Sequence, residues 1–124
     1  KANIQPGDSV LVIGLGAIGL VAAMILKTMG AGTVIGADRS KLRLEQVRKT
    51  GLLDVIDTSE PAWMEQVKEM TAKDGVDIVI EATGAPPVLK DAMAAARTVV
   101  RLLFPVCISA ALMDLSRCLL CEKN

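Results

Sequence analysis

The chain of 124 residues has no histidine, almost no aromatic side chains and no excess of charge of either sign. Without histidine, it lacks the Ser-His-Asp and Cys-His triads of common hydrolases and the histidine ligands of most zinc enzymes. Its only aromatic residues, Trp63 and Phe104, are too few to stack single-stranded bases. Because 14 Lys and Arg balance 14 Asp and Glu, it also lacks the positive charge that binds a phosphate backbone. We therefore expect neither a conventional hydrolase nor a nucleic-acid-binding protein.

Cysteine is scarce as well, and the three cysteines, Cys107, Cys118 and Cys121, all lie within the last 18 residues. An odd number confined to one end is not a framework of disulfide bonds, which favours a reducing, cytoplasmic location. Cys118 and Cys121 have the spacing of a metal-binding or redox pair. Because the chain has no second pair of ligands, we interpret them as ordinary thiols.

Residues 9–26 form an uncharged run of 18, a length at the lower limit for a transmembrane helix. Glycines interrupt this run at Gly14, Gly16 and Gly19, with β-branched residues before them and helix-forming residues after them. The run therefore predicts a strand, a turn and a helix, and no membrane contact.

Short apolar runs rich in β-branched residues alternate with helical segments along most of the chain. We expect five strands, at residues 9–13, 33–37, 55–57, 76–81 and 98–104. These strands are nearly continuous in hydrophobicity, which is typical of a parallel sheet covered by helices on both faces. The pattern predicts an α/β fold.

Cap and turn residues place the helices between these strands. A helix over 17–29 ends at Gly30, and a helix over 41–50 lies between the N-cap Ser40 and Gly51. A third helix has Pro61 in its first turn and carries Trp63, Val67 and Met70 on one face. A fourth runs over residues 86–97.

The alternation of strands and helices stops after Phe104. Residues 106–120 have apolar side chains at helical spacing, and no further strand is expected. We divide the chain into a domain over residues 1–104 and an atypical apolar tail over 105–124, which is either divergent or the altered end of a longer gene product. The fifth strand then lies at the sheet edge, where it is covered by the tail or pairs with a second copy; we favour the homodimer.

The run Gly14-Leu15-Gly16-Ala17-Ile18-Gly19 lies between the first expected strand and the first expected helix. In this context a GxGxxG pattern is typical of a dinucleotide-binding turn. Gly14 permits the tight turn, Gly16 lets a pyrophosphate approach the backbone, and Gly19 lets the helix lie close to the sheet. The helix N-terminus, with Ala17 and Ile18 in its first turn, attracts the diphosphate.

Asp38 follows Gly19 by 19 residues, at the end of the second expected strand. A carboxylate there accepts hydrogen bonds from the adenosine ribose and repels a 2′-phosphate, which predicts NAD over NADP. Arg39 either stacks on adenine or weakens that discrimination by adding a positive charge. Together these features predict a Rossmann-type doubly wound parallel sheet of five strands in the order 3-2-1-4-5.

Three acidic residues near strand ends, Asp57, Asp77 and Glu81, have no recognisable partner in the sequence. We expect them to be solvated or to stabilise turns, and not to act as a general acid or base.

Three segments of the chain resemble the cofactor-binding domain of the zinc-type medium-chain dehydrogenase/reductase family, the alcohol and polyol dehydrogenases. They are residues 6–19, which open with Pro-Gly-Asp, residues 38–41, and residues 81–84, which read Glu-Ala-Thr-Gly. The resemblance covers residues 1 to about 97 and implies that Ala82 and Thr83 line a groove for NAD. It also implies hydride transfer between nicotinamide and an alcohol or carbonyl carbon in the parent protein.

The resemblance implies a catalytic domain that supplies the zinc ligands, and we do not expect that domain within these 124 residues. We therefore expect this chain to bind the cofactor without turnover, with the catalytic domain elsewhere in the parent protein. The alternative is a freestanding nucleotide-sensing module of a transporter or channel, and a remnant that binds nothing is a third interpretation.

Overall fold

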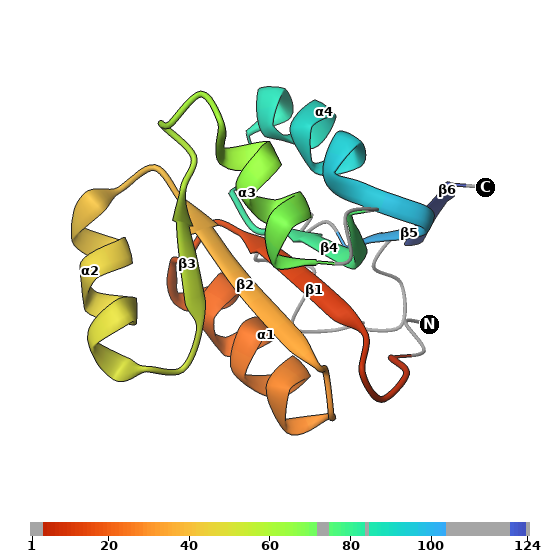
Figure 1. Cartoon of the computed structure of the whole chain (residues 1–124), viewed down its shortest axis with the longest axis horizontal. Helices are drawn as coiled ribbons and strands as arrows, with labels where there is room; N and C mark the ends of the chain where they lie inside the picture. The colour runs from red at the N-terminus through yellow and green to blue at the C-terminus, as the bar shows by residue number, and fades with distance from the viewer. Residues whose placement is uncertain (1–3, 72–74, 84, 104–119, 124) are drawn as a thin grey trace, which may run out of the picture.

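The computed structural model describes residues 4–71, 75–83, 85–103 and 120–123, and within them it shows one sheet with helices on both faces (Figure 1). Helices α1 and α2 cover one face, and α3 and α4 cover the other. The strands are β1 Ser9–Ile13, β2 Thr33–Asp38, β3 Asp54–Asp57, β4 Val76–Glu81, β5 Ala96–Leu103 and β6 Leu120–Lys123. The helices are α1 Ala17–Thr28, α2 Lys41–Thr50, α3 Trp63–Met70 and α4 Pro86–Ala95.

The strand order is β3-β2-β1-β4-β5-β6, so the predicted order of the first five strands is confirmed. These five strands pair in parallel. Ile13, the last residue of β1, is paired with Ala37 on one side and Glu81 on the other. The loops that follow β1, β2 and β4 therefore leave the sheet at the same edge.

Side chains of β1 alternate between two cores, one on each face of the sheet. Val10 and Val12 belong to the core under α1 and α2, whereas Leu11 and Ile13 belong to the core under α3 and α4. All five residues of β1 are buried, as expected for a central strand covered on both faces.

The uncharged run over residues 9–26 divides as predicted into β1, a turn and most of α1. In the described ranges, no helix is both long enough and apolar enough to span a bilayer.

The expectation that no strand follows Phe104 is wrong, because β6 pairs antiparallel with β5. Its four residues, Leu-Cys-Glu-Lys, include two charges and are held by backbone pairing, so hydrophobic pattern gave no signal for them. The prediction that β5 forms the sheet edge is also wrong, and the expected homodimer loses the unpaired strand on which it depended. Leu120 lies in β6 and not in a helix, and residues 106–119 lie outside the described residues.

Helix boundaries agree with the cap residues, with small differences. Ser40 caps α2 by accepting a hydrogen bond from the Arg43 N–H at 3.4 Å, and Gly51 follows α2 in the left-handed conformation with φ of 65°. Pro61 lies in the turn before α3 and not in its first turn. Helix α4 ends at Ala95 because Ala96 already pairs with Val76 of β4.

Candidate functional site

A groove of about 880 Å³ opens at the carboxyl ends of β1, β2 and β4. It contains all of the residues predicted from the sequence to bind a cofactor: Gly14, Gly16, Ala17, Ile18, Gly19, Asp38, Arg39, Ala82 and Thr83. The remaining lining residues, Ser40, Leu42, Arg43 and Gln46, come from the start of α2 and were not predicted. Their only signal in the sequence is their position in the first turns of the helix that follows Asp38.

Gly14 and Gly19 are required where the loop, α1 and the segment after β4 approach one another. Gly14 has φ of 97°, and a Cβ there would lie 2.9 Å from Cγ2 of Thr83 and 3.0 Å from the carbonyl carbon of Ala82. A Cβ on Gly19 would lie only 1.8 Å from the Gly14 carbonyl oxygen. Both glycines therefore do what the motif predicts, one in the turn and one at the helix.

Gly16 differs from these two, because no atom lies within 4 Å of the position that its Cβ would take. That space belongs to the groove. Gly16 is also the N-cap of α1, and because it has no side chain it does not cap the N–H groups of the first turn. Since the first N–H groups of a helix have no intrahelical acceptor and carry the positive end of its dipole, this end of α1 is suited to an anion.

The Asp38 carboxylate links the glycine loop to the start of α2. It is 6% exposed, and its oxygens accept hydrogen bonds from the N–H of Leu15 and of Ser40, each at 2.8 Å. Burial raises the pKa of Asp38, but the hydrogen bonds from Ser40 and Leu15 and the charge of Arg43 outweigh it and lower that pKa below its usual value. Each carboxylate oxygen has a second lone pair, so Asp38 can also accept from a ligand.

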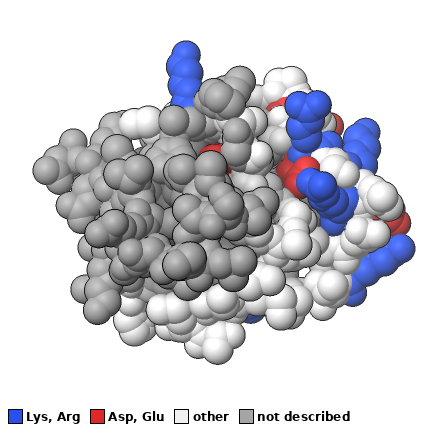
Figure 2. Space-filling model, turned by 180° about the vertical axis from the view of Figure 1, so that it is seen from behind, with Lys and Arg blue, Asp and Glu red and all other residues white. Residues whose placement is uncertain are grey.

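Cations border the groove on the side of α2. Nη1 of Arg43 lies 3.5 Å from Oδ2 of Asp38, and Arg39 lines the groove as predicted. Figure 2 shows Lys and Arg side chains gathered on the side of the molecule that carries α2. A ligand with negative charge therefore meets positive charge at this border as well as at α1.

The acidic residues near strand ends have structural partners. Glu81 is 2% exposed, so it is not solvated, and its Oε1 accepts hydrogen bonds from the Thr83 N–H at 2.5 Å and from the Thr83 hydroxyl. Asp57 stabilises a turn through the N–H and hydroxyl of Ser59, which lower the pKa of Asp57. Asp77 accepts from the N–H and hydroxyl of Ser9 at the opposite end of the sheet.

A second cavity of about 400 Å³ adjoins the groove and shares Gly14, Asp38, Arg39 and Thr83 with it. It extends the site toward α3 and α4, and its other lining residues are Ile13, Thr58, Ser59, Trp63, Val88 and Asp91. An apolar wall next to hydroxyl groups suits a flat heteroaromatic ring. The sequence gave no signal for this cavity, because its walls come from four separate parts of the chain.

The described residues do not contain a zinc site. No three His, Cys, Asp or Glu side chains among them gather in a way that would hold a metal ion, and the sequence has no histidine. No chemistry on this part of the chain is therefore assigned to zinc.

Comparison with known proteins matches residues 17–104 to the family described as zinc-binding dehydrogenase. The chain belongs to this family. Sorbitol dehydrogenase of Bacillus subtilis is 37% identical to this zinc-binding dehydrogenase chain over 97 residues, covering 78% of the chain and 28% of the relative. Alcohol dehydrogenase-like 5 of Arabidopsis thaliana is 38% identical over 100 residues, covering 78% and 25%.

Solved structures agree with this assignment. Alcohol dehydrogenase TADH from Thermus sp. ATN1 superposes with a TM-score of 0.70 at 30% identity, over 89% of this chain and 34% of that one. An NAD-dependent alcohol dehydrogenase gives a TM-score of 0.69 at 29% identity, over 79% and 28%. The zinc-binding dehydrogenase chain described here thus spans about a quarter to a third of the length of these relatives.

Proposed function

We propose that this chain is the NAD-binding unit of an alcohol or polyol dehydrogenase. The observation that carries the proposal is the groove itself, in which the open space over Gly16, the N-terminus of α1 and the Asp38 carboxylate lie together. A pyrophosphate occupies the space over Gly16, and the adenosine ribose lies against Asp38.

In this proposal the groove and the adjoining cavity bind different parts of the dinucleotide. The pyrophosphate requires N–H donors and positive charge, which the first turn of α1 supplies. The adenine requires a flat, partly apolar site, and the cavity beside Trp63 and Val88 has that character. The two spaces meet at Asp38, where the ribose connects the adenine to the pyrophosphate.

NAD is favoured over NADP because the Asp38 carboxylate is held in its ionised form. The hydrogen bonds from Leu15 and Ser40 and the nearby Arg43 stabilise the negative charge, and that charge repels a 2′-phosphate. Arg43 is paired with Asp38, so it offers less positive charge to a phosphate than a lone arginine would. The comparison with an NAD-dependent alcohol dehydrogenase supports the same choice.

When bound, the nicotinamide cofactor supplies the chemistry of hydride transfer. The residues of this chain bind and orient it: α1 holds the diphosphate, Asp38 holds the ribose, and Ala82 and Thr83 line the wall beside the glycine loop. The alcohol or polyol substrate and the catalytic domain belong to the parent protein in this proposal, and its location is the cytoplasm.

Isothermal titration calorimetry of the 124-residue chain with NAD, NADH, NADP and NADPH tests the proposal. We expect NAD and NADH to bind at least about tenfold more tightly than their 2′-phosphorylated forms, a difference of about 1.4 kcal/mol. Equal affinities would refute the role given to Asp38. No binding of any dinucleotide would refute the proposed function.

A further inference from the structure

The glycine loop is attached to strand β2 at three consecutive residues, Gly36, Ala37 and Asp38. The Gly14 N–H donates to the Ala37 carbonyl at 2.8 Å, and the Leu15 N–H donates to the Asp38 carboxylate at 2.8 Å. The third attachment is a packing contact between the Leu15 side chain and Gly36. The two hydrogen bonds hold the backbone of the loop against the end of β2. The packing contact is the one of the three that reaches into the core.

Leu15 is the residue between the first two glycines of the motif, yet its side chain is only 2% exposed. It points away from the groove and belongs to the core under α1 and α2. Leu15 is absent from the residues that line the groove or the adjoining cavity. The loop proposed to bind the pyrophosphate therefore carries, at its middle, a side chain that is buried in the core and does not line the ligand site.

Gly36 provides the space that receives this side chain. A Cβ on Gly36 would lie 2.8 Å from Cδ2 and 3.0 Å from Cδ1 of Leu15, and 3.3 Å from Cδ1 of Leu53. Such distances are shorter than van der Waals contact between carbon atoms, which is optimal at about 3.5 to 4.0 Å. These atoms are the terminal methyl groups of Leu15. Because this side chain is surrounded by the core, an added methyl group on Gly36 would force Leu15 out of its present position.

We infer that Leu15 is a positioning residue for the dinucleotide, and that Gly36 is the seat that sets the height of the glycine loop over the sheet. This inference rests on the proposed function. A loop displaced by a fraction of an ångström presents its N–H groups and the α1 N-terminus in the wrong place for the pyrophosphate. Gly36 thus affects binding from a position within the sheet.

The test uses Gly36→Ala alone and combined with Leu15→Val, with NAD affinity measured by calorimetry on the full chain. The single change is expected to weaken NAD binding about tenfold. The double variant adds one methyl group and removes one methylene group, so it conserves core volume, and it should recover affinity to within about threefold of the parent. A Gly36→Ala variant with parental affinity, or a double variant no better than the single one, would overturn the inference.

Gly32→Ala is the matched control, because Gly32 immediately precedes β2 and its Cβ would also lie 2.8 Å from another atom, the Gly7 carbonyl oxygen. It disturbs the chain at the end of β2 that is remote from the groove. The folded Gly32→Ala protein should bind NAD within about twofold of the parent, although its melting temperature falls. Equal weakening by the two alanines would make the effect one of general stability and would overturn the inference.

Two further measurements keep the inference testable. If Gly36→Ala does not fold, Leu15→Val is compared with Leu53→Val, which removes the same group from a buried neighbour outside the loop; only Leu15→Val should weaken NAD binding. Amide hydrogen exchange by NMR needs no ligand. Gly36→Ala should accelerate exchange of the Leu15 N–H, and the double variant should restore its protection. If these changes in exchange are seen but NAD does not bind, the proposed function is refuted, whereas the role of Gly36 in positioning the loop stands.

Discussion

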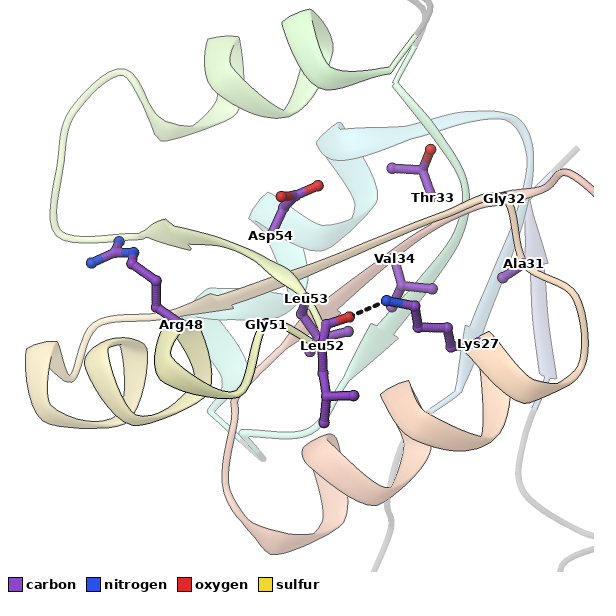
Figure 3. A pocket seen from close by; sticks show the side chains of 10 residues that line it. All are labelled: Lys27, Ala31, Gly32, Thr33, Val34, Arg48, Gly51, Leu52, Leu53 and Asp54. Atoms are coloured by element: carbon purple, nitrogen blue, oxygen red, sulfur yellow. Dashed lines mark hydrogen bonds between the residues drawn. The ribbon is translucent and has the colours of Figure 1, made fainter.

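Two hollows lie at opposite ends of strand β2, and they differ in how their polar groups are arranged. At the carboxyl end, Asp38, Arg43 and the start of α1 surround one groove of about 880 Å³. At the amino end, a hollow of about 360 Å³ is lined by Lys27, Arg48 and Asp54 among others. Figure 3 shows Arg48 and Asp54 pointing away from Lys27, whose ammonium donates to the Leu52 carbonyl. Only the first hollow brings its polar groups to one place.

The difference follows from the direction of the chain in a parallel sheet. Helices that follow a strand begin at its carboxyl end, so free N–H groups meet there, whereas helix C-termini with free carbonyl groups lie at the amino end. Carbonyl groups attract cations, and Lys27 in the last turn of α1 donates to the carbonyl of Leu52, in the turn that follows α2. The carboxyl end of the sheet is therefore suited to an anionic ligand, whereas at the amino end a lysine of the chain itself binds a backbone carbonyl group.

The largest effect is expected at Gly16, where a side chain would enter the groove. Gly16→Val should weaken NAD and NADP alike, by about 100-fold, because its methyl groups take the space of the pyrophosphate. Gly51→Ala is the matched change at the amino-end hollow, since nothing lies within 4 Å of that Cβ either. It should cost about 1 kcal/mol of stability through its positive φ and leave affinity unchanged. Calorimetry on both variants decides, and NAD binding that survives Gly16→Val would place the pyrophosphate elsewhere.

Cofactor discrimination should change next, through the charge of Asp38. Asp38→Asn keeps an oxygen for the Leu15 N–H but removes the repulsion of a 2′-phosphate and releases Arg43. The ratio of NADP to NAD dissociation constants should fall about tenfold. Glu45→Gln, which removes a carboxylate paired with Lys49 on the same helix, is the control and should leave the ratio as it is. An unchanged ratio in Asp38→Asn would show that the groove does not read the ribose through this residue.

A smaller effect concerns stability at low pH. The pKa of Asp38 in the folded chain is lower than its usual value of 3.8, so its ionised form stabilises the fold above that pH. This contribution is lost as the pH falls through the folded pKa. Urea unfolding at several pH values should show the parent losing its advantage over Asp38→Asn below pH 3.8. Asp57, whose pKa is also lowered, is present in both proteins, so its contribution cancels in the comparison. A difference in unfolding free energy between parent and variant that does not change with pH would contradict the prediction.

The parts of this molecule that could be predicted from the sequence are those with a fixed local spacing. The glycines after β1 and Asp38 after β2 are such features, because a turn and a strand end each require particular residues. The contact of Leu15 with Gly36 and the cavity beside Trp63 could not be predicted, because they join side chains from separate elements. Strand β6 gave no signal because an edge strand held by backbone bonds needs no apolar pattern.

The smallest effect is expected at Lys27, and it tests whether the two ends of the sheet are independent. Helix α1 joins them, since its N-terminus borders the groove and Lys27 in its last turn donates to the Leu52 carbonyl. Lys27→Met keeps the apolar stem and removes this exposed hydrogen bond, which should cost at most about 1 kcal/mol of stability. Because α1 is held at the groove by the tight packing of Gly19 against Gly14, NAD affinity should stay within about twofold of the parent. A larger change, with the chain still folded by circular dichroism, would show that α1 transmits changes between the hollows and that the groove is not set by its own end of the sheet.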